Sequence, residues 1–400
     1  YKDELGEIDE SIKANKENTL VIYTPAIPVS NVIWNYFKNE NYTLKKRAEV
    51  LGMITEQYKT IAVAGTHGKT TTSSMIAVVM SESEIKCNAF LGGIAANYNS
   101  NMVLDSHSKW VVVEADEYDR SFLTLVPNLA VVTSTDADHL DIYGDSDSMN
   151  ESFQEFVNKV NPAGKVFLKS DVKLSFGNTE TYSLGNLDSN YYAENVSVEN
   201  GSFVFDAATP IGTIRGIKLG ISGLHNIENA LATVAVCQEI GIENLTIKQG
   251  LEKYKGVKRR FEYIVKTEDV VFIDDYAHHP TEINALVSSV RRLFPGKKVT
   301  GVFQPHLFSR TRDFGEEFSR ELSELDEVIV LDIYPAREKP MEGIDAEFLL
   351  NKIQGIPKRK ETKTTLVDGL NKEEIEVLLT IGAGDISTLV DSIKQKITRI

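Results

Sequence analysis

The residues best suited to chemistry lie in a short segment that starts at Thr60 and reads TIAVAGTHGKTTTSS. An apolar run typical of a buried strand stops before Gly65, and a run typical of a helix follows Lys69. Gly65 and Gly68 let backbone N–H groups turn toward an anion, Lys69 supplies a positive charge, and the hydroxyl of Thr70 suits magnesium. The segment therefore predicts a loop that binds the phosphates of a nucleoside triphosphate. Its predicted contacts are Gly65, Thr66, His67, Gly68, Lys69, Thr70 and Thr71.

This loop is a variant of the standard phosphate-binding pattern, which has another glycine five positions before Gly68. The chain has Val63 at that position. The alternative interpretation is an ordinary glycine turn with an incidental surface lysine. Because the strand, the Gly-Lys-Thr run and the helix occur together, phosphate binding is favoured over this alternative.

Two later apolar runs also end in polar clusters. Glu114 directly follows the run WVVV, and His139 lies in a cluster that follows the run LAVV. The two clusters contain Glu114, Asp116, Glu117 and Asp119, and then Asp136, Asp138, His139 and Asp141. In an open parallel sheet, ligands bind outside the carboxyl ends of the strands, and Mg²⁺ prefers oxygen ligands. Glu114 is therefore the best-placed magnesium ligand, whereas a histidine such as His139, taken alone, is more often structural.

The second half of the chain has further polar groups at predicted element ends. Asn226 and Asn229 open a helix, where their amides could contact a nucleobase or cap the helix, and their spacing does not decide between the two. Asp275, Tyr276 and His278 follow the strand-like run VVFID. The two adjacent histidines of this motif lack a third ligand with the spacing of a zinc site. A catalytic or substrate-binding edge is therefore favoured over a metal site.

Two more motifs contain cationic side chains near predicted strand ends. His306 and Arg310 lie in FQPHLFSRT, and Arg337 and Lys339 lie in LDIYPAREKP. Arginine side chains at such places suit a carboxylate or a phosphate, which they bind in a forked geometry. The alternative for each is a surface salt bridge.

Short apolar runs that alternate with helical stretches must position these groups. From Thr60 onward the pattern is that of parallel strands covered by helices on both faces, which predicts an α/β fold. Between about residues 171 and 222 the segments shorten and are punctuated by Gly and Asn, which predicts inserted hairpins. The stretch from Asn31 to Ile54 has a helical pattern. A basic turn near residue 263 predicts a domain boundary.

Composition narrows the class of protein. The 400 residues include 43 basic and 58 acidic side chains, and the net charge of -15 repels nucleic acid and anionic membranes. No apolar run approaches the roughly eighteen residues that a membrane span needs. The two cysteines, Cys87 and Cys237, have no metal-site spacing and suit a reducing compartment. We therefore expect a cytoplasmic protein with no nucleic-acid partner and no membrane span.

Nine motifs occur in order along the chain: GTHGKT, EADEYDRSF, DADHLDIYG, HNIENALA, GVKRRFE, DDYAHHPTE, FQPHLFSRT, DIYPARE and GAGDI. This set closely resembles the Mur ligases, and within them the members that join L-alanine to UDP-N-acetylmuramic acid. The resemblance runs from about residue 20 to the end of the chain. A phosphate loop alone would not support it.

The resemblance implies a three-domain α/β architecture with a P-loop central domain. It divides the chain into residues 1–56, a remnant of an N-terminal UDP-sugar-binding Rossmann-like domain, residues 57–262, a central ATP-binding domain, and residues 263–400, a C-terminal Rossmann-like ligase domain. It also implies ATP and Mg²⁺ as cofactors, and UDP-N-acetylmuramic acid and L-alanine as substrates of a monomer or weak homodimer. ATP would phosphorylate the lactyl carboxylate, and the amine of L-alanine would attack the acyl phosphate, in peptidoglycan precursor synthesis.

The resemblance also implies roles for individual residues. Lys69 would hold the γ-phosphate, Thr70 and Glu114 would bind one magnesium ion, and His139 would help to bind a second. The other implied contacts are Asn226 and Asn229 with the adenine region, Arg260 and Asp275 with the phosphates and ribose, and Tyr276, His278, His306 and Arg310 with the substrates. The implied catalytic set is Lys69, Glu114, His139 and His278.

The chain departs from the family pattern in one segment and at two single positions. The glycine-rich opening of the N-terminal domain is absent, so we expect an incomplete N-terminal domain and weak binding of UDP. Gln154 stands where several members have a carbamylated lysine, so we expect no carbamate. Tyr118 lies where members of the family vary, and it is given no role.

Other functions stay open at this stage. The nearest is a ligase that attaches a whole tripeptide to the same sugar nucleotide, against which DADHLDIYG argues only by resemblance. DDYAHHPTE and FQPHLFSRT argue against a folylpolyglutamate-type ligase, and a non-catalytic nucleotide-binding module would not need His139, His278 and Arg310. The preference among alanine, serine and glycine is undecided, because side chains of this size differ by only about 1–3 kcal/mol in a pocket.

Overall fold

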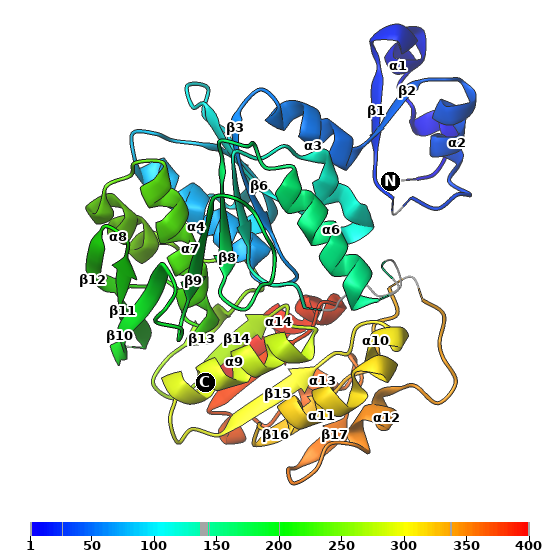
Figure 1. The fold of residues 1–400 in the computed structure, drawn as a ribbon. Helices are drawn as coiled ribbons and strands as arrows, with labels where there is room; N and C mark the ends of the chain where they lie inside the picture. Colours follow the sequence, from blue (N-terminus) through cyan, green and yellow to red (C-terminus); the bar gives the residue numbers. More distant parts are fainter. Residues whose placement is uncertain are drawn as a thin grey trace. The chain divides into compact units, whose positions relative to one another are not determined.

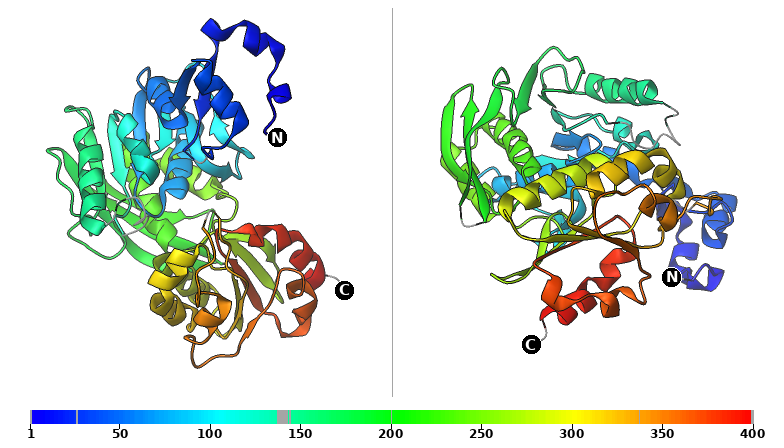
Figure 2. Two further views of the ribbon diagram at one scale, coloured as in Figure 1. Left: turned by 90° about the vertical axis from the view of Figure 1, so that its right-hand side faces the viewer. Right: turned by 90° about the horizontal axis from the view of Figure 1, so that it is seen from below.

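The computed structural model describes residues 2–25, 27–136, 143, 145–199, 201–336 and 338–398 (Figures 1 and 2). The chain forms two compact units, each built from separate stretches. Unit 1 consists of Tyr1–Lys69, Ile85–Phe90 and Leu104–Thr181, and unit 2 consists of Thr70–Glu84, Leu91–Val103 and Tyr182–Ile400. Within the described part, no helix has the length and apolar character needed to cross a membrane.

The first part of unit 1 is a small α/β element around two parallel strands, β1 Leu20–Tyr23 and β2 Thr43–Lys46. Its helices are η1 Leu5–Glu7, α1 Glu10–Ala14, η2 Lys16–Asn18, α2 Val32–Asn39 and α3 Arg47–Thr55. A cluster of Ile8, Phe37 and Tyr42 forms its core.

The expectation of one helix from Asn31 to Ile54 is wrong in its middle. The side chain of Asn31 accepts the backbone N–H of Trp34 at 2.7 Å and starts α2. The chain leaves this helix at Asn41, whose φ of 55° is left-handed. Tyr42 then packs on Phe37 with 4.9 Å between ring centroids, so tertiary packing directs the next residues into β2 and overrides their helical pattern.

The centre of unit 1 is a parallel sheet of apolar strands. β6 and β7 both pair in parallel with β3, β8 pairs with β7, and the start of β4 pairs with β6. The bounds are β3 Lys59–Ala64, β4 Asn88–Ala95, β6 Trp110–Glu114, β7 Leu129–Val132 and β8 Lys165–Lys169. Alanine and valine fill these strands because helices cover the sheet, so no strand needs a polar face.

Aromatic residues of unit 1 cover one face of this sheet. They come from η3 Tyr118–Thr124 and α6 Ser146–Asn158. Phe122 lies against Phe153 and Phe156, with centroid distances of 5.3 and 5.1 Å. All three belong to the core formed with the strand residues of β3, β6, β7 and β8.

The predicted hairpins are confirmed in unit 2. β10 Tyr191–Glu199, β11 Ser202–Thr209 and β12 Gly212–Lys218 form an antiparallel meander. With β5 Ser100–Val103 and β9 Thr179–Ser183 they complete a ten-stranded sheet in the order β12-β11-β10-β9-β8-β7-β3-β6-β4-β5. The helices that accompany the meander are α4 Lys69–Glu82, α7 His225–Glu239 and α8 Asn244–Lys253.

The C-terminal part of unit 2 is a six-stranded sheet in the order β13-β14-β18-β15-β16-β17. Only β13 is antiparallel to its neighbour. The bounds are β13 Glu262–Lys266, β14 Val271–Asp275, β15 Val299–Phe303, β16 Glu327–Val330, β17 Lys358–Lys360 and β18 Val377–Ile381.

Helices cover both faces of this sheet, as Figures 1 and 2 show. Val302 faces the cluster that contains Ile393 of α14, whereas the next residue, Phe303, packs on Phe318 of α11 at 5.4 Å. The helices are α9 Pro280–Leu293, α10 Phe308–Asp313, α11 Gly315–Leu322, α12 Ala346–Leu350, α13 Leu366–Gly369, η4 Lys372–Glu374, η5 Asp385–Leu389 and α14 Val390–Thr398. Successive side chains of β15 thus point to opposite faces of the sheet, and both faces are covered by helices.

Candidate active site

The predicted phosphate loop lies between β3 and α4, as its sequence indicates. Gly65 and Gly68 have φ of 126° and 79°, a region that residues with a Cβ rarely adopt. A Cβ on Gly65 would lie 2.2 Å from Oγ1 of Thr133 and 2.8 Å from the backbone nitrogen of Ser134. Glycine is therefore required both for the turn and for the close approach of the loop to the end of β7.

The residues after β7 hold the loop in place. The N–H of Thr66 donates to the carbonyl of Ser134 at 3.2 Å, and the N–H of His67 donates to the Ser134 hydroxyl at 2.9 Å. The hydroxyl of Thr66 donates to the carbonyl of Asp136 at 2.8 Å. Nε2 of His67 lies 3.2 Å from the carboxylate of Asp136. Side chains of this loop thus serve to anchor it to the neighbouring strand end.

Lys69 is nearly buried and faces acidic side chains. Its Nζ donates to the carbonyls of Gly65 at 2.6 Å and Thr66 at 3.2 Å, and it lies 2.8 Å from Glu117. Burial acts to lower the pKa of Lys69, but the carboxylates of Glu117 and Glu114 outweigh it, and the net shift is upward. The ammonium therefore stays charged in a place where water is scarce.

Glu114 ends β6 beside the loop. The register pairs Val63 with Glu114, two residues before Gly65. The pairing therefore places the carboxyl ends of β3 and β6 side by side. The charges of Glu114, Asp116 and Glu117 all favour the charged form of Lys69, so three carboxylates act on one ammonium. Anionic phosphates can bind beside such an acidic group only if a further cation accompanies them.

The described residues contain no group of three or more His, Cys, Asp or Glu side chains that would hold a metal ion by themselves. Glu114, at the end of β6 beside the loop, is an oxygen donor of the kind that Mg²⁺ prefers, and this ion usually takes one or two carboxylates together with water and substrate phosphates. His139, the other predicted magnesium ligand, lies outside the described residues. Gln154, for which we expect no carbamate, bonds to Ser175 through both ends of its amide at 2.8 and 2.9 Å.

Thr70 and Thr71 lie in the first turn of α4 and are buried. Thr71 accepts a hydrogen bond from the hydroxyl of Ser74 through its carbonyl at 2.9 Å. Thr70 accepts one from Ser73 in the same way at 3.2 Å. The serine hydroxyls of the next turn of α4 thus bond to the backbone carbonyls of its first turn.

Asn226 and Asn229 are buried at the start of α7 and are linked to each other. Nδ2 of Asn229 donates to Oδ1 of Asn226 at 3.0 Å, and Nδ2 of Asn226 donates to the carbonyl of Ser222 at 2.6 Å. The hydroxyl of Thr72 in α4 donates to Oδ1 of Asn229 at 3.1 Å. The two amides therefore join α4 to α7. Burial and the charge of Arg260 lower the pKa of the neighbouring His225 to about 4.

The remaining predicted residues gather at the carboxyl ends of β14 and β15 in unit 2. Arg260 lies 5.0 Å from the ring centroid of Tyr276, and His278 lies 5.4 Å from it. The ring of His278 is 5.9 Å from that of His306, and Nη1 of the buried Arg310 is 3.4 Å from Nδ1 of His306. The structure thus brings these five predicted residues together.

Asp275 is the last residue of β14, directly before Tyr276, and is buried. Its carboxylate accepts the N–H groups of Phe261 and Ala277, both at 2.7 Å. Burial raises the pKa of Asp275 from 3.8 to about 6, against the opposing charge of Arg260. The folded protein therefore binds a proton at Asp275 over a pH range in which the unfolded chain has already lost it.

This shift predicts a pH-dependent effect of Asp275→Asn on stability. Asp275 stabilises the fold most below pH 3.8, and this contribution falls as the pH rises to about 6. At 1.36 kcal/mol per pKa unit, the free energy of unfolding of the wild type should fall by about 3 kcal/mol relative to the variant across this range. Urea denaturation at several pH values measures the difference. Asp368→Asn, at an exposed position, is the control, and a flat difference for Asp275→Asn would contradict the prediction.

Several residues of the site were not found from the sequence. Glu117 was noted only as part of an acidic cluster, yet it is the carboxylate that contacts Lys69. Tyr334 stacks on His306 with 5.7 Å between centroids, and its signal was an aromatic residue a few positions after the apolar run of β16. Glu282 lies 3.3 Å from Nδ1 of His278 and also accepts the N–H groups of His278 and His279. It thereby completes the capping box of α9, whose N-cap residue is His279.

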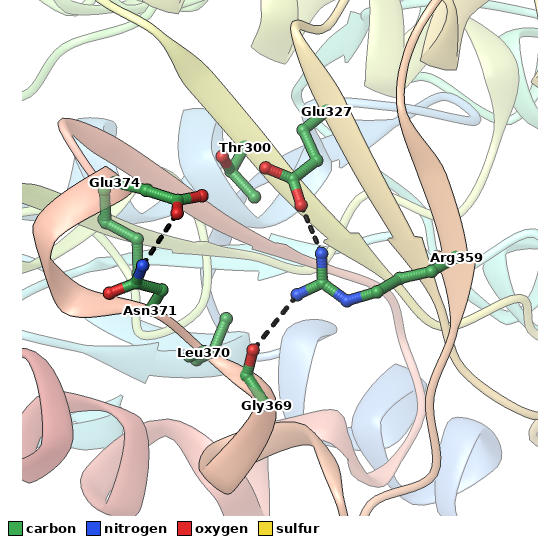
Figure 3. A pocket seen from close by; sticks show the side chains of 8 residues that line it. Thr300, Glu327, Arg359, Gly369, Leu370, Asn371 and Glu374 are labelled. Carbon is green, nitrogen blue, oxygen red and sulfur yellow. Dashed lines mark hydrogen bonds and ion pairs between the residues drawn. The ribbon is translucent and has the colours of Figure 1, made fainter.

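A cavity of about 70 Å³ lies elsewhere, at one edge of the C-terminal sheet, and none of the predicted site residues lines it (Figure 3). Arg359 pairs there with Glu327 and donates to the carbonyl of Gly369 at 3.4 Å. Asn371 donates to Glu374 at 2.7 Å. The charged and polar groups that line the cavity therefore bond mainly to one another. The cavity does not belong to the candidate active site.

Comparison with known proteins supports the predicted family. Residues 63–237 match the Mur ligase middle domain, and residues 259–384 match the domain described as Mur ligase, glutamate ligase domain. The UDP-N-acetylmuramate–L-alanine ligase of Christiangramia forsetii is 48% identical over 99% of this chain and 86% of that protein. The protein of the same name from Flavobacterium psychrophilum is 50% identical over 95% of this chain and 84% of that protein.

Solved structures agree with this assignment. The crystal structure of UDP-N-acetylmuramate-alanine ligase MurC from Thermotoga maritima superposes with a TM-score of 0.81 at 26% identity, covering 94% of this chain and 84% of that one. The predicted α/β architecture of the Mur ligases is confirmed by this likeness and by the domain matches. With a relative 48% identical over nearly its whole length, the chain belongs to the Mur ligase family.

Proposed function

We propose that this protein is an ATP-dependent amide ligase that joins L-alanine to UDP-N-acetylmuramic acid in peptidoglycan precursor synthesis. One structural observation carries the proposal, and a sequence similarity supports it. The ammonium of Lys69 lies in a glycine loop beside the carboxyl end of β6. The chain is also 48% identical over 99% of its length to the UDP-N-acetylmuramate–L-alanine ligase of Christiangramia forsetii. The local chemistry supports phosphoryl transfer from a nucleotide, and the similarity supports these two substrates.

Lys69 has the charge that the first step requires. When the lactyl carboxylate attacks the γ-phosphate of ATP, negative charge gathers on the transferred group while ADP leaves. The ammonium of Lys69 and the first N–H groups of α4 offset this charge. The backbone of the loop itself needs little reorganisation, because it is already bonded to the end of β7 through Thr66 and His67.

Magnesium fits the residues of this site. Glu114 and the hydroxyl of Thr70 are oxygen donors of the kind that Mg²⁺ prefers, and the surrounding carboxylates outnumber the one ammonium. The ion would supply the positive charge that lets a polyphosphate bind beside these acids. His139 remains a predicted ligand of a second ion.

The groups at the ends of β14 and β15 are suited to the second step. The amine of L-alanine attacks the acyl carbon, the amide forms, and phosphate leaves with the bonding electrons. His278 is the proposed acceptor of the proton that the amine releases, because Glu282 at 3.3 Å stabilises its charged form. Arg260, Asp275 and the amides of Asn226 and Asn229 are proposed nucleotide contacts. Tyr276, His306 and Arg310 are proposed substrate contacts.

The domain division at residues 1–56, 57–262 and 263–400 is also part of the proposal. It is supported by the sheets, since β1 and β2 pair only with each other among the described strands, and β13–β18 form a sheet of their own. The cytoplasmic location and the monomer or weak homodimer stay predictions.

A phosphate-release assay tests the function directly. We expect release of phosphate from ATP only when Mg²⁺, UDP-N-acetylmuramic acid and L-alanine are all present, with the amide product detected by mass spectrometry. Hydroxylamine added without L-alanine should yield a hydroxamate of the sugar acid, which reports the acyl phosphate. Preference for the tripeptide over L-alanine would replace the proposal with the recycling ligase. Nucleotide binding without turnover under all these conditions would favour a non-catalytic module.

A further inference from the structure

Glu117 contacts the lysine of the phosphate loop directly. Both of its carboxylate oxygens lie 2.8 Å from Nζ of Lys69, and the side chains of Glu117 and Lys69 are 1% and 12% exposed. Nζ also donates to the carbonyls of Gly65 and Thr66 at 2.6 and 3.2 Å. An ammonium has three N–H donors. In this structure all three are therefore directed at the loop and at Glu117.

The backbone around Glu117 is held from several sides. The hydroxyl of Tyr143 donates to its carbonyl at 2.6 Å, and the N–H of Arg120 donates to the same carbonyl at 2.9 Å. Asp119 and Arg120 are consecutive non-glycine residues with φ of 53° and 54°, and Lys46 bonds the carboxylate of Asp119 at 2.7 Å. Such strained backbone persists only where the surroundings impose it, and it is frequent at functional sites. The position of Glu117 is therefore built into the fold.

The terminal phosphates of a nucleotide need the same ammonium. A phosphate oxygen can reach Nζ only by replacing one of its present acceptors, and Glu117 is the one that carries a negative charge. Two anions that share one buried cation repel each other strongly, because little solvent screens them. Glu117 therefore opposes the approach of the phosphates to Lys69.

We propose that Glu117 is a positioning residue that holds Lys69 in the phosphate loop and competes with nucleotide phosphates for it. This inference rests on the proposed function in taking ATP as the nucleotide. Competition of this kind weakens the binding of ATP and ADP alike. It also returns Lys69 to a defined place when ADP and phosphate leave, so that the loop does not retain its anionic products.

Calorimetric titration of the full chain with ATP and with ADP, both in excess Mg²⁺, tests this role. Glu117→Gln keeps the shape of the side chain and removes its charge. We expect it to bind ATP and ADP about tenfold more tightly than the wild type, while kcat in the phosphate-release assay falls because ADP leaves more slowly. A merely structural role predicts the opposite sign, since a disordered loop binds nucleotide more weakly.

Two further variants separate the ion pair from general charge. Asp116→Asn removes a charge nearby without removing a bond to Lys69, and its Kd for ATP is expected to shift less than about twofold. Equal tightening by Asp116→Asn and Glu117→Gln would overturn the proposal. Once Lys69 is methionine, Glu117→Gln should no longer tighten binding, and tightening as large as that in the wild type would also overturn it.

Other results are equally decisive. Weaker nucleotide binding by Glu117→Gln, or loss of the dependence of ATP binding on Mg²⁺, would refute the proposal and make Glu117 a supporting residue or a metal ligand. If Glu117→Gln does not fold, Glu117→Asp keeps the charge but retracts it, and it should tighten ATP binding by a smaller factor.

Since these binding measurements need neither the sugar nucleotide nor L-alanine, tighter ATP binding by an inactive protein would refute only the proposed substrates.

Discussion

Replacing Lys69 with methionine is expected to lower the rate of phosphate release by about 10³-fold or more. Methionine keeps most of the length of the lysine side chain but has no charge to offset that of the transferred phosphoryl group. The phosphates of ATP then also lack the ammonium that would attract them, so the binding of ATP should weaken as well. The measurement is phosphate release under single-turnover and steady-state conditions, with all substrates present.

The controls for Lys69→Met address stability. Burial raises the pKa of Glu117, and Lys69 is the main group that opposes this shift, so the single variant leaves a buried acid without its charged partner. Breaking a buried pair in this way destabilises a protein by about 3–5 kcal/mol. Lys69→Met with Glu117→Gln should recover most of this stability but not the activity. Lys109→Met, at an exposed position in the same unit, should retain activity. Wild-type turnover by Lys69→Met would remove the chemical basis of the proposed function.

Gly65→Ala is expected to abolish nucleotide binding and to lower the free energy of unfolding by about 3–5 kcal/mol. The alanine Cβ would lie 2.2 Å from Oγ1 of Thr133 and 2.8 Å from the nitrogen of Ser134, at a φ of 126°. No side-chain rotation relieves an overlap with backbone, so β7 or the loop must move. Such a movement breaks the bonds by which Ser134 holds Thr66 and His67.

Urea denaturation and ATP titration measure the two effects of Gly65→Ala. Gly177→Ala is a matched control in the same unit, because a Cβ there meets nothing within 4 Å and its φ is not in the left-handed region. This control should change the stability by less than about 1 kcal/mol. If Gly65→Ala binds ATP with wild-type affinity, the turn is not the phosphate site.

The local elements of the fold could be predicted from the sequence. The strand β3, the loop and α4 follow from an apolar run, two glycines and a helical run within a short segment. The hairpins β10–β12 follow from short alternating runs separated by turn residues. The helix predicted from Asn31 to Ile54 was wrong at β2, because the pairing of β2 with β1 depends on residues more than twenty positions away.

The candidate site, too, could be predicted from the sequence only in part. The chemical types near the strand ends, such as Lys69, Glu114 and Asp275, could be identified because each lies within a few residues of the end of an apolar run. The alternatives for Asn226 could not be separated, because its amide bonds to Asn229, which in turn contacts Thr72 at a sequence separation of 157. The roles of the predicted site residues in catalysis stay predictions until the variants are measured.

By itself, the sequence determined which groups the phosphate loop contains, since glycine, lysine and threonine act there through neighbours a few residues apart. Only the tertiary structure decided what Lys69 contacts. Its partner Glu117 is 48 positions away, and the two meet because β6 pairs with β3 in a register that aligns their carboxyl ends. An ion pair between distant residues depends on strand order, burial and the local dielectric, and none of these is a property of a short segment.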